Sequence, residues 1–215
     1  MRGSSTSLHA GDTVNRRLVG SPSVLGRAFY ARPTLRVARD LLGARLVRVS
    51  NGRRLVGIIT ETEAYIGEKD LGCHAKAGRT PRTEVMYGPP GHAYIYFTYG
   101  NHWMLNVVTE ARDHPAAVLI RAIQPVDGME IMARRRSGRD THGPGKLTQA
   151  LGITRAQNGA DLTIPVSGLW IEAGARVPDA LVTRGPRVGL NTVPEPWKSK
   201  PWRFLVRDWD VGSGE

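Results

Sequence analysis

Apolar positions follow two different periods along this chain, and these periods mark its predicted elements. Between Pro33 and Gly43 the apolar residues recur at the helical spacing, which predicts a helix over 34–42. The run over 55–59 is apolar on both faces of an extended chain. We therefore predict a strand over 54–64 whose middle is buried on both sides.

Turn signals divide the rest of the chain into short elements. Asn51-Gly52 predicts a hairpin between strands over 44–49 and 54–64, and Gly100-Asn101 predicts a second hairpin. A short helix is predicted to open at Gly143-Pro144-Gly145-Lys146 and to end at Gly152. The remaining predictions are strands over 93–99, 102–109, 116–123 (ended by Pro125), 169–172, 187–190 and 203–207, and a helix over 126–136.

Strands and helices do not alternate regularly in this order, which argues against a doubly wound parallel sheet. The prediction is a single α+β domain over 23–215, with a curved, mostly antiparallel sheet, peripheral helices and a protruding β-hairpin. Residues 1–22 are rich in Ser, Gly and Arg and are expected to form a flexible arm. The connection over 67–91 is long enough that a functional role is expected for it.

The charge of the chain points to an anionic partner. Thirty Lys and Arg residues stand against nineteen Asp and Glu, for a net charge of +11, and all but five of the cations are arginine. The planar guanidinium group suits bidentate contact with phosphate. Nucleic acid is the favoured partner, with an unremarkable basic enzyme as the alternative.

Other classes of protein fit the sequence less well. The single cysteine, Cys73, excludes an internal disulfide and a cysteine-rich zinc site, and the six histidines lack metal-ligand spacing. No apolar run approaches the ~20 residues of a membrane span. We expect no metal, no membrane contact and a cytoplasmic location near the nucleoid, or a nuclear one in a eukaryote.

A possible active site begins where the long predicted strand ends. Side chains alternate along a strand, so Glu61, Glu63 and Tyr65 share one face. A glutamate just beyond a buried run is partly desolvated, which raises its pKa and makes it a better base. The alternative is a pair of glutamates bound to arginines at an exposed strand end.

Three tyrosines follow in the second predicted hairpin. Tyr94 and Tyr96 share one face of their strand, and Tyr99 comes at the hairpin tip. A stiff, exposed ring at a tight turn suits insertion between base pairs, and Tyr96 lies deep enough to stack on an extruded base. The alternative is ordinary packing, since aromatic residues are common in strands.

The glycine-rich turn at 143–146 is similar to an anion-binding helix start but lacks the full P-loop pattern. A DNA phosphate is a better ligand for it than a nucleoside triphosphate. Three basic side chains are predicted to contact DNA phosphates: Arg79, Arg82 and Lys146. His74 lies in the long connection, where a lone histidine is more often a surface residue than a catalyst.

Taken together, six motifs over roughly residues 31–207 resemble the alkyladenine (3-methyladenine) DNA glycosylase family. The motifs occur in the family's order and spacing: Glu61-Thr62-Glu63-Ala64-Tyr65, Gly72-Cys73-His74-Ala75, Thr80-Pro81-Arg82, Tyr94 to Asn106, Leu119-Ile120-Arg121-Ala122 and Gly143-Pro144-Gly145-Lys146-Leu147. Residues Asn101 and His102 depart from the family pattern at the hairpin tip, where a bulkier residue is frequent.

The resemblance implies a role for each matching residue. Glu63 is expected to be the general base that activates water, and Arg121 and a main-chain carbonyl near Val188 to help bind that water. The other implied roles concern the DNA: Tyr65, His74 and Tyr96 sandwich the flipped base, Tyr99 fills the gap in the duplex, and Asn106 obstructs the amino group of normal guanine.

The implied activity is base excision repair without a cofactor. The enzyme is expected to act as a monomer on duplex DNA, to flip out 3-methyladenine, 7-methylguanine or hypoxanthine, and to leave an abasic site. No lysine is expected close enough to the site for Schiff-base chemistry, so no strand cleavage is predicted. The alternatives are a non-catalytic binder that stacks bases on its aromatic residues, and a hydrolase or transferase acting on small nucleosides.

Overall fold

The longest strand of the fold starts at the predicted Asn51-Gly52 turn. In the computed structural model, which describes residues 23–98 and 100–207, β1 (Arg45–Ser50) and β2 (Arg53–Ile66) pair as an antiparallel hairpin around this turn. Asn51 and Gly52 have positive φ angles of 50° and 70°, as a two-residue hairpin turn of this type requires. Residues 55–59 are buried, as predicted.

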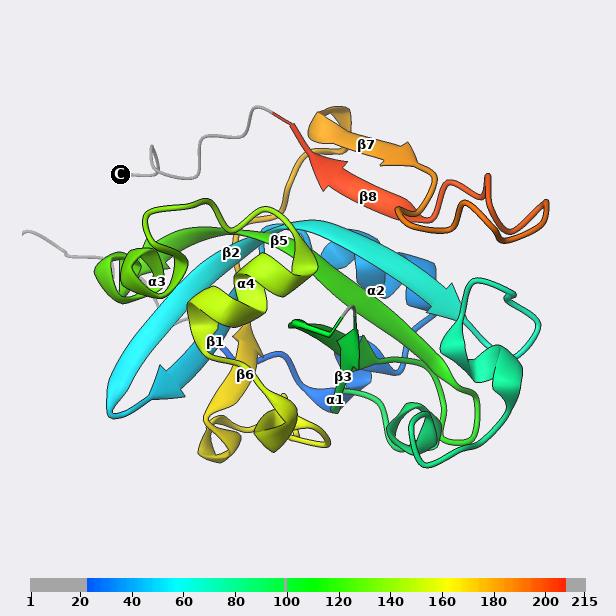
Figure 1. Ribbon diagram of the computed structural model, residues 1–215, viewed down its shortest axis with the longest axis horizontal. Coiled ribbons are helices and arrows are strands. Elements are labelled where there is room, and N and C mark those ends of the chain that lie inside the picture. Colours follow the sequence, from blue (N-terminus) through cyan, green and yellow to red (C-terminus); the bar gives the residue numbers. More distant parts are fainter. Residues whose placement is uncertain (1–22, 99, 208–215) are drawn as a thin grey trace, which may run out of the picture.

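One antiparallel sheet contains all of the strands in the described part of the chain (Figure 1). Six of them follow the order β3-β4-β5-β2-β1-β6, and β8 pairs with both β2 and β7. This arrangement confirms the predicted α+β class. The other strands are β3 (Ala93–Thr98), β4 (His102–Val108), β5 (Ala116–Asp127), β6 (Leu169–Glu172), β7 (Val182–Gly185) and β8 (Arg203–Val206).

Helices cover both faces of this sheet. Helix α2 (Thr34–Asp40) packs behind β2 and β5, and α4 (Pro144–Leu151) crosses in front of β4 and β5 (Figure 1). The remaining α-helices are α1 (Arg27–Tyr30) and α3 (Met129–Arg136). Five short 3-10 helices lie in the connections of the described part of the chain: η1 (His74–Ala77), η2 (Glu84–Tyr87), η3 (Arg155–Gln157), η4 (Pro165–Ser167) and η5 (Asp179–Leu181).

Two of the three apolar clusters in the described residues hold the layers beneath the site together. The larger one joins the helices to the middle of the sheet and includes Leu41, Ile59 and Ile120, all fully buried. The smaller cluster contains Cys73, Ala75, Met86, Tyr94, Val108 and Ala117, and the partly buried rings of Tyr65 and Tyr96 pack against it. This smaller cluster therefore supports the aromatic residues that the sequence singled out.

Several predicted boundaries are wrong. Strand β5 does not end at Pro125 but continues to Asp127, because Pro125 pairs with Gly57 at an irregular point of the ladder where a missing N–H is tolerated. Helix α3 starts three residues later than predicted, after Gly128 adopts a left-handed conformation with φ 68°. The strand predicted over 187–190 is absent from the described fold, and β7 lies just before it instead.

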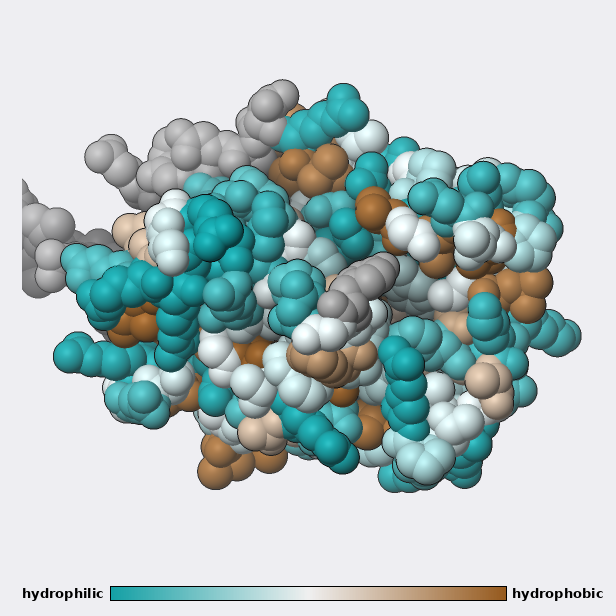
Figure 2. Space-filling model, viewed as in Figure 1, coloured by the Kyte–Doolittle hydropathy of each residue, from teal (hydrophilic) through white to brown (hydrophobic). Residues whose placement is uncertain are grey.

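The predicted arm over 1–22 and the proposed wedge Tyr99 lie outside the described residues. Hydrophilic side chains cover most of the face shown in Figure 2, with scattered apolar patches between them. Within residues 23–98 and 100–207, no helix has both the length and the apolar character needed to cross a bilayer.

Candidate active site

A cavity of about 430 Å³ opens over three neighbouring strands of the sheet. Its volume falls in the range of small-molecule pockets. Alternate residues of β3, β4 and β5 form the floor, because side chains at every second position share one face of a strand. These residues are Tyr94, Tyr96 and Thr98 from β3, His102, Met104 and Asn106 from β4, and Ala117, Leu119 and Arg121 from β5.

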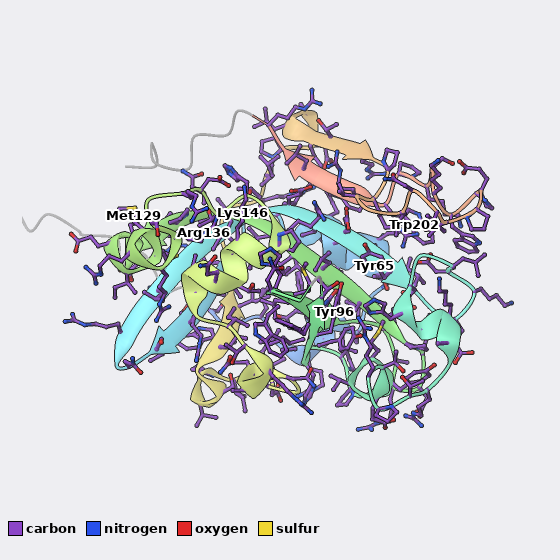
Figure 3. All side chains as sticks on the ribbon, viewed as in Figure 1. Tyr65, Tyr96, Met129, Arg136, Lys146 and Trp202 are labelled. Carbon is purple, nitrogen blue, oxygen red and sulfur yellow. The ribbon has the colours of Figure 1, made fainter. Side chains whose placement is uncertain are left out.

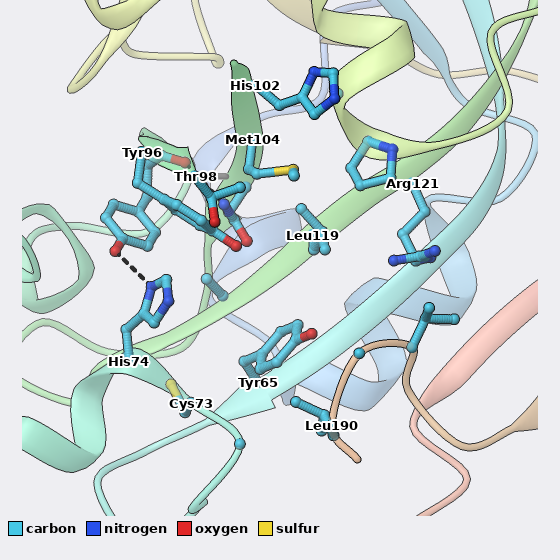
Figure 4. Close-up of a pocket in the computed structure, with 18 of the residues that line it drawn as sticks. Tyr65, Cys73, His74, Tyr96, Thr98, His102, Met104, Leu119, Arg121 and Leu190 are labelled. Atoms are coloured by element: carbon cyan, nitrogen blue, oxygen red, sulfur yellow. Dashed lines mark hydrogen bonds between the residues drawn. The ribbon is translucent and has the colours of Figure 1, made fainter. Parts of the chain in front are cut away.

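Three loops and the end of β2 close the sides of this cavity. Tyr65 comes from the end of β2, and His74 from the start of η1 in the long connection (Figure 4). The first residues of α4, Gly143 to Lys146, form another side, and residues 188–190 form the last. Figure 3 shows Tyr65 and Tyr96 in the middle of the molecule, with Lys146 toward α4.

Glu63 lies directly behind the residues that line this cavity. Its side chain has no solvent exposure, and its carboxylate accepts a hydrogen bond from the Tyr65 hydroxyl (2.8 Å) and one from the Val188 N–H (2.7 Å). The guanidinium Nε of Arg121 lies 3.4 Å from the same Oε1 atom that Val188 contacts. Tyr65, Arg121 and Val188 all line the cavity, so the contacts of Glu63 connect it to the cavity although it is not itself among the lining residues.

Burial raises the pKa of the Glu63 carboxyl above its ordinary value. The charge of Arg121 and the hydrogen bonds from Val188 and Tyr65 act in the opposite direction and partly compensate. The predicted desolvation of this glutamate is therefore confirmed. A carboxylate with a raised pKa is a stronger base, and its two hydrogen bonds and the charge of Arg121 favour the ionised form.

The neighbouring Glu61 is bound to arginines, as in the alternative interpretation of the motif, but it is buried and not at an exposed strand end. Its Oε1 accepts a hydrogen bond from Arg121 Nε (2.9 Å) and one from Arg203 Nη1 (3.3 Å). Burial alone would lower the pKa of Arg121, but the charges of Glu63 and Glu61 outweigh it and raise the pKa. The two glutamates of the motif therefore have different surroundings: Glu61 anchors Arg121, and Glu63 is enclosed beside the cavity.

Two of the predicted base-binding rings touch one another. The His74 and Tyr96 rings meet edge to face with centroids 4.5 Å apart, and Tyr65 approaches the cavity from another element (Figure 4). Burial, followed by the charges of Arg82 and Lys76, lowers the pKa of His74 to about 4. The imidazole is therefore neutral at physiological pH.

The structure places Arg82 next to these rings. Its guanidinium lies over the Tyr96 ring at 5.2 Å, and its Nη2 is 3.4 Å from His74 Nε2. Arg79 is not part of the cavity wall: it pairs with Asp113 at 2.9 Å and Glu84 at 3.4 Å. The contacts of Arg79 and Arg82 with DNA phosphates stay predictions.

The amide of Asn106 donates to the main-chain oxygen of Tyr94 (3.1 Å) within the cavity floor. Its predicted contact with guanine stays a prediction. The Val188 prediction concerned a carbonyl, whereas the contact observed is the N–H on Glu63.

Lys146 lines the cavity, because the helix α4 that carries it packs on β4 and β5. Its ammonium group lies 3.1 Å from both carboxylate oxygens of Asp140. The predicted absence of Schiff-base chemistry stays a prediction.

The sequence pattern did not identify several of the residues that line the cavity. Met104 and Leu119 stand two positions from Asn106 and Arg121 on their strands, so strand alternation was a signal that could have found them. The partnership of Glu61 with Arg121 was not predictable in the same way, because these residues lie 60 positions apart.

Comparison with known proteins agrees with this geometry. Residues 28–210 match the family model described as methylpurine-DNA glycosylase (MPG). The chain belongs to this family. The resemblance seen in the six motifs is confirmed, and membership of the methylpurine-DNA glycosylase family supports a role as a DNA glycosylase in DNA repair.

Relatives from several organisms match most of this chain. Proteins named "Putative 3-methyladenine DNA glycosylase" from Myxococcus xanthus and Methanocella arvoryzae are 53% and 51% identical to it. One of the same name from Carboxydothermus hydrogenoformans is 47% identical. Each alignment covers 86% of this chain and, in that order, 90%, 93% and 96% of the relative.

Proposed function

We propose that this chain removes alkylated purines from duplex DNA by hydrolysing the N-glycosidic bond, which leaves an abasic site. The observation that carries the proposal is the position of Glu63, a buried carboxylate bound to residues that line a cavity with aromatic rings in its wall. 3-Methyladenine and 7-methylguanine are the proposed substrates. Hypoxanthine is neutral and needs a proton to leave, so it is expected to be excised more slowly.

The cavity receives a nucleotide rotated out of the helix. Flipping costs a few kcal/mol and is least costly for damaged or poorly paired bases. Insertion of Tyr99 into the vacated stack offsets part of this cost. DNA phosphates bind the basic rim, where Arg82 and Lys146 lie close to the cavity.

The rings of the cavity favour a cationic base. Alkylation at N3 or N7 gives the purine a positive charge, and electron-rich rings attract it by a cation–π interaction of about 0.5–2 kcal/mol. Tyr65, Tyr96 and the neutral His74 supply these rings. Asn106 in the floor discriminates against the amino group of undamaged guanine.

Glu63 acts as the general base. As the C1′–N bond breaks, its electron pair leaves with the purine and positive charge develops on the sugar. A water molecule attacks C1′ and gives its proton to Glu63, while the carboxylate also stabilises the sugar charge. One carboxylate suffices because alkylation has already activated the leaving group, in contrast to the pair in most glycosidases.

The chain is proposed to act as a monomer and without lyase activity. Lys146 is the lysine nearest to the chemistry in the described residues, and its ammonium is ion-paired with Asp140. We expect no covalent complex when borohydride is added during turnover, whereas trapped enzyme would show Schiff-base chemistry.

The deciding experiment uses a labelled duplex with one 7-methylguanine. Wild type is expected to release the base, and Glu63→Gln to bind the duplex as tightly without releasing it. Binding with no release by wild type would favour the non-catalytic binder. Release from a free nucleoside at the same rate as from the duplex would favour the nucleoside enzyme.

A further inference from the structure

A buried ion pair connects three segments that meet at the site. Asp70 and Arg187 are both enclosed, with no exposure of either side chain, and they are 117 positions apart in the sequence. Arg187 Nη2 donates to Asp70 Oδ1 at 2.8 Å, and Nη1 donates to the other oxygen. None of the roles proposed above uses this pair.

Main-chain hydrogen bonds extend the pair into its surroundings. Asp70 accepts the N–H groups of Ile66 (3.2 Å) and Gly72 (3.0 Å), at the end of β2 and just before His74. Arg187 donates to the carbonyls of Ala64 (3.0 Å) and Trp197 (3.3 Å). The pair thus links β2, the loop that carries His74 and the loop that carries Val188.

Two residues of the proposed active site contact Arg187 or its neighbour: Tyr65 contacts Arg187, and Glu63 contacts Val188. The Arg187 guanidinium lies over the Tyr65 ring at 4.6 Å and over the Trp202 ring at 5.0 Å. The next residue along the chain, Val188, donates its N–H to Glu63. Arg187 therefore contacts the Tyr65 ring and directly precedes the residue whose N–H binds Glu63.

We propose that Asp70 and Arg187 are positioning residues, which place the Val188 N–H on Glu63 and the Tyr65 ring against the base. Neither touches the substrate. The proposal rests on the proposed function, since Glu63 must be the base for its position to affect the rate. Such a role requires the arginine fork in particular, because a lysine ammonium lacks the planar group that contacts both Asp70 oxygens and stacks on the Tyr65 ring.

The test compares Arg187→Lys and Asp70→Asn with two controls away from the cavity. Arg54→Lys makes the same change in the Arg54–Glu172 ion pair, and Ile171→Ala removes a fully buried side chain from β6. Single-turnover release of 7-methylguanine is measured against pH. Exchange of the Val188 amide hydrogen is followed by NMR, with the amides of β8 as internal reference.

Loss of the Val188 bond should affect the pH profile in a defined direction. Glu63 is faced by Glu61, Tyr65, Arg121 and the Val188 N–H, with Arg203 bound to Glu61, and removing a donor from the carboxylate raises its pKa. We expect the acid limb to move to higher pH in both variants. The rate should fall about tenfold or more, because small misplacements of reacting groups are costly. Val188 should exchange at least about tenfold faster.

The controls should lower the melting temperature without changing the pH profile or the Val188 exchange. Should Arg187→Lys behave like Ile171→Ala, with lower stability but an unchanged rate, profile and exchange, the pair has no positioning role. Should wild type release no base at all, the proposed function fails, and unchanged Val188 exchange in Arg187→Lys would still overturn the positioning role. Arg187→Lys keeps the charge balance, so it serves if Asp70→Asn does not fold.

Discussion

The carboxylate of Glu63 is bound by groups from three separate segments. Tyr65 lies on the same strand, Arg121 on the neighbouring β5, and Val188 in a loop. Burial costs an ionised carboxylate solvation free energy, and these groups return part of it. The pKa of Glu63 is therefore raised by burial, while its contacts favour the ionised form that the proposed role as a general base requires.

This balance predicts that Glu63→Gln stabilises the protein at neutral pH. The folded pKa lies above the ordinary value of 4.5, so the contribution of Glu63 to stability is fully present below pH 4.5 and is lost as pH rises through the folded pKa. A neutral isostere avoids this loss. We expect the free energy of unfolding at pH 7 to rise by about 1 kcal/mol, as often found when a catalytic group is removed.

Chemical denaturation at pH 7 and pH 4 measures this effect. The difference between wild type and Glu63→Gln should shrink or vanish at pH 4, where the wild-type carboxyl is protonated in both states. If Glu63→Gln were less stable than wild type at pH 7 but as stable as wild type at pH 4, the Glu63 charge would be favourable in the fold.

At the residue scale, local spacing predicted some contacts and not others. The Glu63–Tyr65 hydrogen bond follows from strand alternation, because the two residues are two positions apart. The contacts of Glu63 with Val188 and of Asp70 with Arg187 cross 125 and 117 positions. They depend on a loop that the sequence pattern suggested was a strand, and no periodicity in the chain encodes them.

At the scale of elements, β2 positions most of the site. It pairs with β1, β5 and β8, and its register with β5 shifts on both sides of Glu61. Such irregularities redirect side chains and are frequent beside active sites. The strand therefore delivers Glu61, Glu63 and Tyr65 to the site while its first half remains in the core.

Close contact between β2 and β5 predicts a large effect of Gly57→Ala. A Cβ at position 57 would lie 2.5 Å from Ile123 Cδ1 and 2.8 Å from its Cβ, and the Ile123 side chain is fully buried. Overpacking of this kind costs about 1–3 kcal/mol. Urea denaturation should show this loss for Gly57→Ala. The control Gly26→Ala, where no atom lies within 4 Å of the added Cβ, should change stability little; equal effects would contradict the predicted clash.

Elements with strong local signals were predictable, and those set by tertiary pairing were not. The Asn51-Gly52 hairpin and the helix between Gly143 and Gly152 follow from turn chemistry. Strand β5 passes through Pro125 because the partner strand is irregular opposite it, which depends on pairing across the sheet. Strand β7 is four residues long, and its backbone hydrogen bonds are made by pairing with β8.

At the scale of the whole molecule, charge and fold class were both accessible from the sequence. The net charge of +11 needs no structure, and irregular alternation of elements indicated the antiparallel α+β arrangement. How the cavity forms was less accessible, because its floor comes from three strands and its sides from the end of β2 and three further segments. The hydrophilic face in Figure 2 agrees with a surface that contacts a polar partner.

The excess of arginine predicts a steep salt dependence of duplex binding. Each phosphate neutralised by the protein releases counterions, so the logarithm of the binding constant falls linearly with the logarithm of salt concentration. Removing a phosphate contact by Arg82→Ala should reduce the slope by about 1. Fluorescence anisotropy with an undamaged duplex measures both slopes, and a binding constant independent of salt would exclude the proposed DNA interface.

Glu61 and Glu63 belong to one motif, but only Glu63 is proposed to be the general base. The measurement that tests this difference is single-turnover release of 7-methylguanine by Glu63→Gln and by Glu61→Gln. Each variant is used at a concentration that saturates the duplex, and its binding to the duplex is confirmed separately. Glu63→Gln should lose at least about 100-fold in rate, as expected for a missing general base, while Glu61→Gln loses about tenfold or less through a displaced Arg121. Release by Glu63→Gln at the wild-type rate would contradict the account.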